Sequence, residues 1–244
     1  MAEYGTPRDH LADVALAARD WANLNPEAFA RGPLTRDDIL SARMISDPLT
    51  KADCCLVTDG AAACVLVRAD RAKDLPGKPV YFLGAGAANH HRSIVAMPDL
   101  TTTAAAESGP RAMDMAGVRQ ADLDLVMVYD AFTINTILFL EDLGFCPKGE
   151  GGRFVADGRI APGGDLAVNT NGGGLSCVHP GMYGLFLIAE AVAQIRGGAG
   201  ARPERHRFGV ELVRPARLGR DRSTQAAGPR KRPAPRKELE WPPR

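Results

Sequence analysis

Two apolar runs, each followed by a helical pattern, restrict this chain to a small set of folds. The first run, LDLVMVYD over residues 123–130, leads into FTINTILFLEDL at 132–143. The second, LAVNT over 166–170, leads through a glycine-rich turn into GMYGLFLIAEAVAQIR at 181–196. Continuously apolar strands are buried on both faces, and strands that alternate with helices form largely parallel sheets. The sequence therefore predicts an α/β fold whose sheet is covered on both faces.

The first 120 residues carry similar signals. Leu11, Val14, Ala18 and Trp21 recur at helical spacing, which predicts an amphipathic helix over 8–23. Apolar periodicity, capping residues and glycine–proline breaks predict the other elements: a short helix near 35–43 that begins at Thr35, a buried strand over 52–67 with a turn at Asp59-Gly60, a short helix that ends at Pro76-Gly77, a strand at 79–85, and a helix at 103–117 that Gly109-Pro110 weakens.

The composition is that of a globular protein. The 244 residues are 45% hydrophobic and 24% charged. No apolar run approaches the roughly 20 residues that a membrane span needs. The first ten residues, MAEYGTPRDH, lack the apolar segment of a signal peptide, and the five cysteines show no disulfide framework. We therefore expect a cytoplasmic protein with reduced thiols and no membrane partner.

The net charge of +1 conceals a change of composition at about residue 200. Residues 201–244 hold thirteen Lys or Arg against five Asp or Glu, together with seven of the eighteen prolines. A segment with low hydrophobicity and high charge cannot bury enough surface to order itself, so we expect a disordered tail. Its basic residues are interrupted by acids and prolines, and they cluster at Arg230-Lys231-Arg232 alone. We therefore expect no nucleic-acid partner.

The stretch NTNGGGLSCVHPGMYG at 169–184 combines three glycines, a cysteine and a histidine, and three functions are open to it. A phosphate cradle would end in Lys-Ser/Thr or follow the pattern G-x-G-x-x-G, and neither is present. A nucleophile–base pair of Cys177 and His179 would need a third group to orient the base, and cysteine is among the residues most often simply buried.

The third interpretation concerns His179 alone. Pro180 fits the first position of the following helix, which would place His179 at the helix N-cap. The positive end of a helix disfavours an imidazolium, so the ring would stay neutral and could accept a proton. The alternative is a loop histidine that is hydrogen-bonded to a carbonyl group, and the local sequence leaves both open.

The same stretch resembles the histidine motif of the thiolase superfamily. The resembling branch includes the thiolase domain of sterol carrier protein X and the bacterial lipid-transfer proteins, which are acetyl-CoA acetyltransferase-like. NPEAF at 25–29 and MISDPLTKADCCLVTDGAAACVLV at 44–67 are similar to the end of that family's first half. VYDAFTINTILFLEDLGFCPKGEGG at 128–152 resembles its Asn-Glu-Ala-Phe or His-Asp-Cys-Phe segment, and the similarity runs over roughly residues 3–200.

The resemblance implies a layered αβαβα fold made of two similar halves, of which this chain holds an incomplete first half and most of the second. Residues 1–76 would be a remnant of the N-terminal half and residues 77–200 the C-terminal domain, so we expect a chain truncated at both ends. In residues 201–244 the family pattern stops abruptly. We interpret this basic, Pro/Arg-rich tail as a shifted reading frame, and another frame of the coding DNA should restore a glycine-rich ending.

The resemblance implies two catalytic residues, His179 and Tyr129. In the family, the matching histidine activates a nucleophilic cysteine and helps to bind the thioester oxygen, and the residue matched by Tyr129 polarises the same carbonyl. The implied substrate is a coenzyme A thioester, with no covalently bound cofactor and no metal. The implied partners are the acyl-CoA and either further copies of the chain or a partner subunit. No residue of this chain is assigned to coenzyme A. Asp130 could cap the following helix or take part in the chemistry.

The family's nucleophile-bearing segment has no counterpart in this chain. Cys54, Cys55, Cys64 and Cys146 do not occupy its motif, and Cys54-Cys55 falls in a predicted buried strand, where inert thiols are usual. We therefore expect a thiolase-like acyltransferase, of the acetyl-CoA acetyltransferase or lipid-transfer type, that is inactive as this chain alone. Two alternatives stay open. One is a non-catalytic protein that binds acyl-CoA or a partner chain, and the other is a carbon–carbon lyase acting on a β-hydroxyacyl-CoA.

Overall fold

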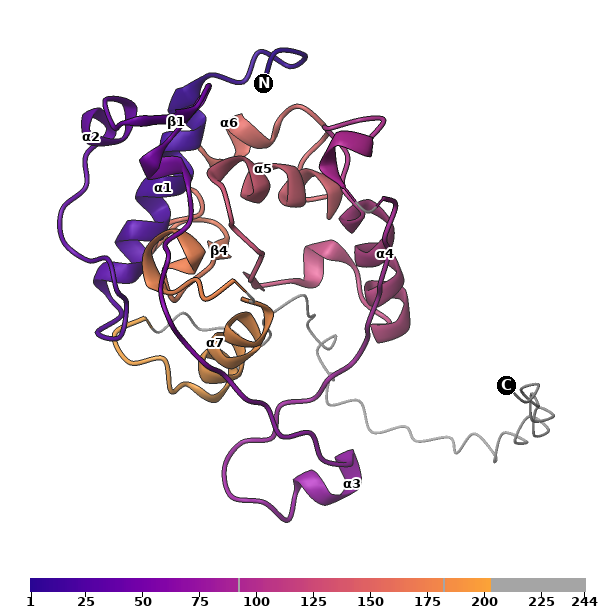
Figure 1. Ribbon diagram of the computed structural model, residues 1–244. Coiled ribbons are helices and arrows are strands. Elements are labelled where there is room, and N and C mark those ends of the chain that lie inside the picture. Colours follow the sequence, from indigo (N-terminus) through magenta and orange to yellow (C-terminus); the bar gives the residue numbers. More distant parts are fainter. Residues whose placement is uncertain (92, 182, 203–244) are drawn as a thin grey trace, which may run out of the picture.

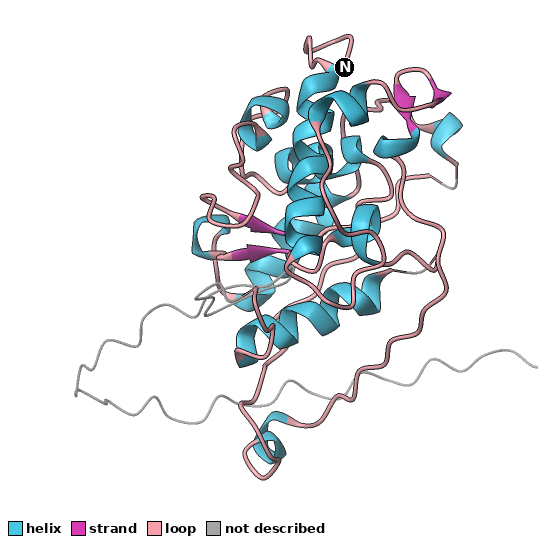
Figure 2. Cartoon of the chain, turned by 90° about the vertical axis from the view of Figure 1, so that its left-hand side faces the viewer, coloured by secondary structure: helices cyan, strands magenta, loops and turns pink. Residues whose placement is uncertain are grey.

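Helix α1 (Arg8–Asn23) supports the rest of the molecule in the computed structural model, which describes residues 1–91, 93–181 and 183–202 (Figures 1 and 2). The side chains that spacing assigned to its apolar face are all buried. The helix contacts segments from both ends of the chain, namely α2 (Arg36–Leu40), α5 (Thr133–Asp142), α6 (Gly151–Val155) and the π-helical turn η4 (Gly173–Cys177). The amphipathic helix predicted over 8–23 is therefore confirmed.

The short helix predicted near 35–43 forms as α2 and begins, as expected, at Thr35. Asp38 Oδ2 accepts the Thr35 N–H at 2.8 Å, and Thr35 Oγ1 accepts the Asp38 N–H at 3.1 Å. This reciprocal arrangement is a capping box, which satisfies donors that a helix start leaves unpaired. An antiparallel pair, β1 (Met44–Ser46) and β2 (Leu49–Thr50), follows α2.

A buried carboxylate joins this N-terminal region to the centre of the protein. Asp53, at the end of the 3-10 turn η1 (Lys51–Asp53), accepts the hydroxyls of Thr50 and Thr133 at 2.8 Å each. Because Thr133 is the first residue of α5, these bonds hold that helix start beside the chain at residues 50–54.

The prediction of strands at 52–67 and 79–85 is wrong for the described residues. After η1, the chain makes a single bridge between Cys54 and Phe132, and no strand is assigned across 79–85. Val57 and Val65 are 98% and 90% exposed. A strand needs a neighbour to receive its backbone hydrogen bonds, so these apolar segments stay irregular where the described structure gives them none.

Between those segments the predicted short helix does form, as α3 (Ala69–Ala72). It lies in a loop that extends away from the rest of the protein (Figure 1). Further along, the helix predicted at 103–117 is confirmed as α4 (Ala105–Ala116), between the 3-10 turns η2 (Ile94–Ala96) and η3 (Gln120–Asp122).

Gly109 has a packing role in α4 that its low helix propensity conceals. A β-carbon at this position would collide with Leu143 Cδ2, so the glycine allows α4 to approach the end of α5 closely. Pro110 is accommodated beside it within the helix, and Gly117 ends the helix in the left-handed conformation, with φ of 71°.

Two short parallel strands form the centre of the fold. In β3 (Leu125–Val126) and β4 (Ala167–Val168), Leu125 is opposite Ala167 and Val126 is opposite Val168. The strands are shorter than the apolar runs that predicted them, because the ladder stops at Asn169, whose φ is 50°. A residue with positive φ cannot continue an extended strand.

Both faces of this strand pair are covered by helices. Val126 and Val168 pack into a core cluster that α1 and α5 complete, whereas Leu125 and Ala167 pack with Trp21 and α7 (Gly184–Arg196). Alternating side chains of a strand point to opposite faces, so each face meets its own helices. The predicted α/β fold with a sheet covered on both faces is confirmed.

The predicted tail falls almost wholly on residues 203–244, which lie outside the described residues, so it stays a prediction. Arg202, the last described residue, is buried and pairs with Glu190 at 3.0 Å. The division at residues 76 and 77 stays a prediction. None of the described helices is both long and apolar enough to cross a membrane.

We expect Leu140→Ala to lower the free energy of unfolding by about 2–5 kcal/mol, because Leu140 is fully buried in the cluster around Val126 and its truncation leaves a cavity. Urea titration followed by circular dichroism measures the change. Leu100→Ala removes the same atoms from a side chain that is 62% exposed, and it should change the free energy by less than about 0.5 kcal/mol. Equal effects of the two substitutions would contradict this account of the core.

Candidate active site

The parallel strands bring two distant loops to one edge of the sheet. Tyr129 follows β3, and the glycine turn that leads to His179 follows β4. Ligands in open α/β folds bind beyond the carboxyl ends of the strands. The structure places the two residues in contact there.

Tyr129 and His179 form a hydrogen-bonded pair. The phenol oxygen lies 2.9 Å from His179 Nε2, and the rings meet edge to face with centroids 5.4 Å apart. The phenol oxygen is also 3.2 Å from the Gly181 carbonyl oxygen. The single phenol proton can be donated either to Nε2 or to that carbonyl, and in the second case Nε2 carries the proton and donates it. A proton can therefore lie on either side of this contact.

His179 is not a helix cap, which corrects the prediction from Pro180. Helix α7 begins at Gly184 with Tyr183 as its N-cap, and Gly181 turns the chain before it with φ of 83°. The argument that the helix end keeps the imidazole neutral is therefore wrong. The backbone of His179 is held instead by Thr58, since its N–H donates to Thr58 Oγ1 at 2.9 Å.

The phenol of Tyr129 stays protonated at neutral pH. Partial burial raises its pKa, and the Cys55 thiol and the Asp130 carboxyl add to the effect. A protonated phenol is a hydrogen-bond donor that can reach a ligand oxygen. Among the described residues, no group of three or more His, Cys, Asp or Glu side chains could hold a metal ion.

Tyr183 packs against the rings of both Tyr129 and His179. It is fully buried, its hydroxyl donates to Asn171 Oδ1 at 3.0 Å, and its ring lies 6.0 Å from that of Tyr129 and 6.2 Å from that of His179. Phe186 stacks on its other side, at 5.9 Å. Burial raises the pKa of Tyr183 well above its usual value, so this phenol is also neutral.

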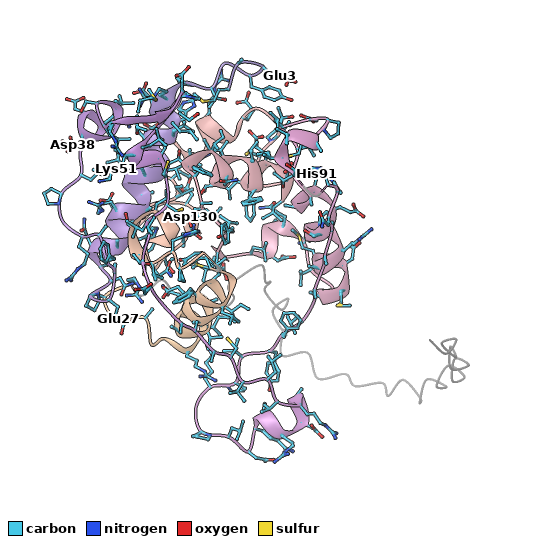
Figure 3. All side chains as sticks on the ribbon, in the orientation of Figure 1. Glu3, Glu27, Asp38, Lys51, His91 and Asp130 are labelled. Atoms are coloured by element: carbon cyan, nitrogen blue, oxygen red, sulfur yellow. The ribbon has the colours of Figure 1, made fainter. Side chains whose placement is uncertain are left out.

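Two of the three glycines, Gly173 and Gly174, lie against a carboxylate of the protein itself, whereas Gly172 lies against Ala22, and this packing replaces the phosphate-cradle interpretation. Asp130 is buried inside the molecule (Figure 3). Its Oδ1 accepts the Gly174 N–H at 2.7 Å, and its Oδ2 lies 3.4 Å from the Leu175 nitrogen. A β-carbon on Gly173 would overlap Asp130 Oδ2. The glycines are therefore needed for close approach to an internal anion.

Asp130 does not cap the following helix, the first of the two roles open to it. Asn135 Oδ1 accepts the Phe132 N–H at 3.0 Å at the start of α5. Burial raises the pKa of Asp130 from 3.8 to about 7, although hydrogen bonds from Gly174, Leu175 and Asn169 oppose the shift. Sequence reasoning missed the contact with the glycine turn. The available signal was an acidic residue directly after a buried strand in a chain that also holds a Gly-Gly-Gly turn.

None of the five cysteines is hydrogen-bonded to His179 in the described structure, and Cys64 is the exposed one among them. Cys177 is buried beside Asn25 Nδ2 at 3.5 Å, and burial raises its thiol pKa to about 11. Burial raises the pKa of Cys146 to about 12, and it also raises those of Cys54 and Cys55. These thiols are protonated at neutral pH, and Cys54 and Cys55 are half-buried in irregular chain rather than in a strand.

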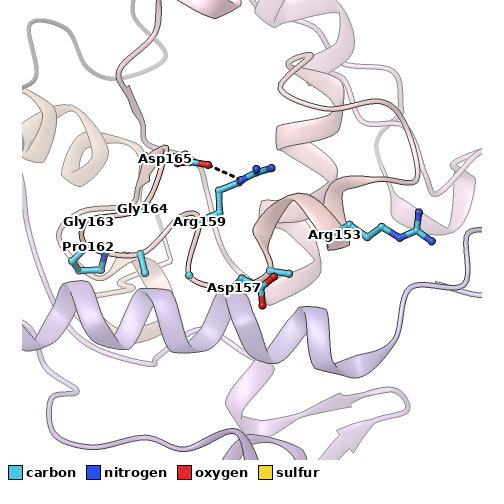
Figure 4. Close-up of a pocket in the computed structure, with 10 residues that line it drawn as sticks. Arg153, Asp157, Arg159, Pro162, Gly163, Gly164 and Asp165 are labelled. Carbon is cyan, nitrogen blue, oxygen red and sulfur yellow. Dashed lines mark hydrogen bonds and ion pairs between the residues drawn. The ribbon is translucent and has the colours of Figure 1, made fainter.

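A cavity of about 600 Å³ lies elsewhere, lined by residues 153–165 (Figure 4). Two arginines line it, but both are paired with carboxylates. Arg159 Nε lies 2.9 Å from Asp165, and Arg153 Nη1 lies 3.1 Å from Glu150. Because both guanidinium groups already face carboxylates and no contact in the described structure links this cavity to Tyr129 or His179, we assign no ligand to it.

Residues 86–212 match the family described as thiolase C-terminal domain-like, and both Tyr129 and His179 fall in the matched region. An acetyl-CoA acetyltransferase of Methanothermobacter thermautotrophicus is 41% identical over 208 residues, which are 83% of this chain and 53% of that protein. The 17-hydroxy-3-oxo-4-pregnene-20-carboxyl-CoA lyase of Mycobacterium tuberculosis is 40% identical over 203 residues, which are 79% of this chain and 50% of that protein. The chain spans about half the length of these relatives.

A solved structure, the Ltp2-ChsH2(DUF35) aldolase, superposes with a TM-score of 0.75 at 31% identity, over 83% of this chain and 54% of that chain. The similar proteins thus include both an acetyltransferase and carbon–carbon lyases.

We expect Gly173→Ala to destabilise the protein more than Gly158→Ala, by at least about 1 kcal/mol, because overlap with a buried group is added to the strain. Both glycines have positive φ, 65° and 74°, so both substitutions carry the strain of a left-handed alanine. Only at Gly173 does the new β-carbon meet Asp130, whereas nothing lies within 4 Å of a β-carbon added at Gly158. Thermal or urea unfolding measures both. Equal losses would mean that the turn does not close on the carboxylate as described.

Proposed function

Because the chain belongs to the thiolase superfamily through its thiolase C-terminal domain-like region, we propose that it supplies the histidine part of a site that acts on acyl-CoA thioesters. The observation that carries the proposal is the 2.9 Å contact between Tyr129 and His179 at the carboxyl edge of the parallel strands. The acetyl-CoA acetyltransferase relative supports acyl transfer as the first candidate reaction.

The pair suits a thioester carbonyl for a physical reason. When a nucleophile attacks that carbon, negative charge develops on the carbonyl oxygen, and fixed donors stabilise the charge. When Nε2 carries the proton, the Tyr129 hydroxyl and His179 Nε2 are two donors 2.9 Å apart, and each can exchange its present acceptor for a thioester oxygen placed beside the pair. The aromatic packing of Tyr183 limits their movement, so little reorganisation is needed when the charge appears.

Acyl transfer also needs a thiolate. The thiols of Cys54, Cys55, Cys146 and Cys177 are held protonated, and none is hydrogen-bonded to His179 in the described part of the chain. We therefore propose that this chain alone binds an acyl-CoA without becoming acylated. A partner subunit or a further copy would complete the site. The exposed apolar side chains of 57–67 support such a partner, and a cytoplasmic location stays a prediction.

A carbon–carbon lyase is the second candidate, favoured by tyrosine at position 129 and by the lyase relative. In that reaction a base takes the proton of the β-hydroxyl group, and the bond between the α- and β-carbons breaks. The β-carbon becomes a carbonyl, the electron pair moves through the α-carbon to the thioester oxygen, and the α-carbon then receives a proton. This sequence needs a proton acceptor and a donor to the oxygen, which the pair supplies, but no thiol.

We expect the full chain to bind acetoacetyl-CoA in calorimetric titration and to catalyse no measurable thiolysis. His179→Ala should weaken binding about tenfold, because a hydrogen bond of about 1.5 kcal/mol to the thioester is lost. His90→Ala is the matched control, since His90 is an exposed histidine that pairs with Glu107. Robust thiolysis that disappears in His179→Ala would show that a usable thiol is present and would contradict the proposal of a non-acylated chain.

If the lyase reaction is the correct one, the chain should release a carbonyl product from a β-hydroxyacyl-CoA. Tyr129→Phe should then lower kcat roughly 10²–10³-fold, the usual effect of removing one donor to a developing oxyanion. Tyr81→Phe, at a position 48% exposed, should have no effect. Cleavage that persists unchanged in Tyr129→Phe would remove the phenol from the mechanism. Mass spectrometry of the products measures both variants.

A further inference from the structure

We propose that Asp130 is a positioning residue, whose ionised carboxylate holds the glycine turn at 173–175 and thereby sets the place of the His179 imidazole. The consequence for catalysis rests on the function proposed above, whereas the hold on the turn does not. Nothing in the acyl-CoA chemistry described above uses Asp130, although it follows Tyr129 directly and is 1% exposed.

Tyr129 and Asp130 point to opposite faces of the sheet beyond the end of β3. Tyr129 packs with the cluster that contains Leu125 and Met127, so it lies on the face that α7 covers. Side chains alternate along a strand, which directs Asp130 to the other side. There its oxygens meet successive N–H groups of the turn, Gly174 at 2.7 Å and Leu175 at 3.4 Å. A side chain four residues beyond β3 therefore reaches the turn that follows β4.

Gly174 connects the carboxylate to the imidazole. A β-carbon built on it would lie 3.0 Å from His179 Cδ2 and 3.1 Å from Asp130 Oδ1, so the glycine backbone is enclosed between the two side chains. Its carbonyl is held from outside by the Leu56 N–H at 2.9 Å. A shift of the turn away from Asp130 would move Gly174 against the face of the His179 ring.

The hold depends on the charge of Asp130. A carboxylate accepts strongly at both oxygens, whereas protonation turns one of them into a hydroxyl, which is a weaker acceptor and whose proton needs an acceptor of its own. Asn169 supports the charged form with a further side-chain hydrogen bond, while burial opposes it and raises the pKa to about 7. The protein therefore contains both forms near neutral pH.

The thiols and phenols that face this carboxyl do not neutralise it. They are the thiols of Cys55 and Cys177 and the phenols of Tyr129 and Tyr183. The His179 ring lies across Gly174 from the same carboxyl. Burial raises the pKa of each of these thiols and phenols, so they stay uncharged where Asp130 titrates. The hydrogen bonds from Gly174, from the backbone N–H of Asp130 itself, and from Leu175 and Asn169 are thus the main support of the anion.

The pH dependence of folding stability distinguishes a positioning role for Asp130 from a simply stabilising one. The folded-state pKa of Asp130 is about 7 against an ordinary value of 3.8, so the folded protein binds more protons than the unfolded chain between those values. This group's contribution to stability is therefore present at low pH and is lost as pH rises towards 7. Over the same pH range, ionisation makes both oxygens of Asp130 available as acceptors for the N–H groups of the turn. The ionised state thus weakens the fold while it orders the site.

The test compares Asp130→Asn with Asp53→Asn in the full chain. Asp53 is an equally buried carboxyl whose bonds go to Thr50 and Thr133, so its variant controls for the general effect of losing a buried acid. Amide proton shifts of Gly174 and Leu175 are followed by NMR from pH 5.5 to 8.5. Acetoacetyl-CoA affinity is measured over the same range.

In the wild type and in Asp53→Asn, we expect the two amide shifts to titrate with a midpoint near 7 and the affinity to rise across that midpoint. In Asp130→Asn the shifts should be flat, the imidazole resonances of His179 should move, and affinity should fall about tenfold and lose its pH dependence. The unfolding midpoint of this variant should fall less between pH 5.5 and 8 than that of the wild type.

The measurements distinguish a failure of the positioning proposal from a failure of the proposed function. Amide shifts that do not titrate near pH 7 in the wild type overturn the proposal by themselves, even if Asp130→Asn does not fold. Unchanged His179 resonances and affinity in a folded Asp130→Asn overturn it while leaving acyl-CoA binding intact. If the amides titrate and His179 responds but no variant binds acetoacetyl-CoA, the positioning role stands and the proposed function fails.

Discussion

The parallel pairing of β3 and β4 is the constraint on which the rest of the structure depends. Two residues of each strand are enough to align the strand ends, and Asn169 then completes the edge. Its backbone N–H donates to Val126, and its side-chain Oδ1 accepts the Val128 N–H at 2.8 Å. Because this asparagine adopts a left-handed conformation, the chain turns at once into the glycines instead of extending the sheet. Tyr129 and His179 could not meet if either strand were shifted by one residue, since a shift reverses every side chain.

The site is held by groups that are individually unfavourable to bury. Asp130 is a carboxyl in an apolar interior, and Tyr183 is a phenol with no exposure. Each is retained by specific hydrogen bonds, Asp130 by the amides of the turn and Tyr183 by Asn171. A buried polar group that has lost its partner costs about 1–3 kcal/mol, so these groups tolerate few alternative arrangements. Burying these polar groups costs free energy, and the hydrogen bonds that offset the cost also restrict the side chains to few positions. A site with fixed side-chain positions is suited to stabilise charge on a ligand.

The segments at 54–68 and 79–85 show the opposite situation. Their sequences are rich in valine and in aromatic or small residues that suit a strand, yet in the described structure they are irregular and Val57, Val65 and Phe82 are exposed. Strand propensity reports how well a residue fits a half-buried pleated surface, so it has no effect where the neighbouring strand is missing. Thr58, which lies in the first of these segments, accepts the His179 N–H. The position of His179 therefore depends partly on a segment that forms no regular secondary structure.

The sequence by itself determined the features that rest on local periodicity and on motif. These are helices α1, α4, α5 and α7, the cap at Thr35, the α/β alternation and the pairing of Tyr129 with His179 at a strand edge. Features that depend on groups distant in the sequence were decided only by the tertiary structure. Helix α7 begins after His179, and the glycine turn packs on Asp130 rather than on a phosphate. Two apolar segments that were expected to be strands do not join a sheet in the described structure. The physical reason is that helix periodicity and capping act within a few residues, whereas a strand, a buried charge and a hydrogen-bond partner are each completed by groups far along the chain.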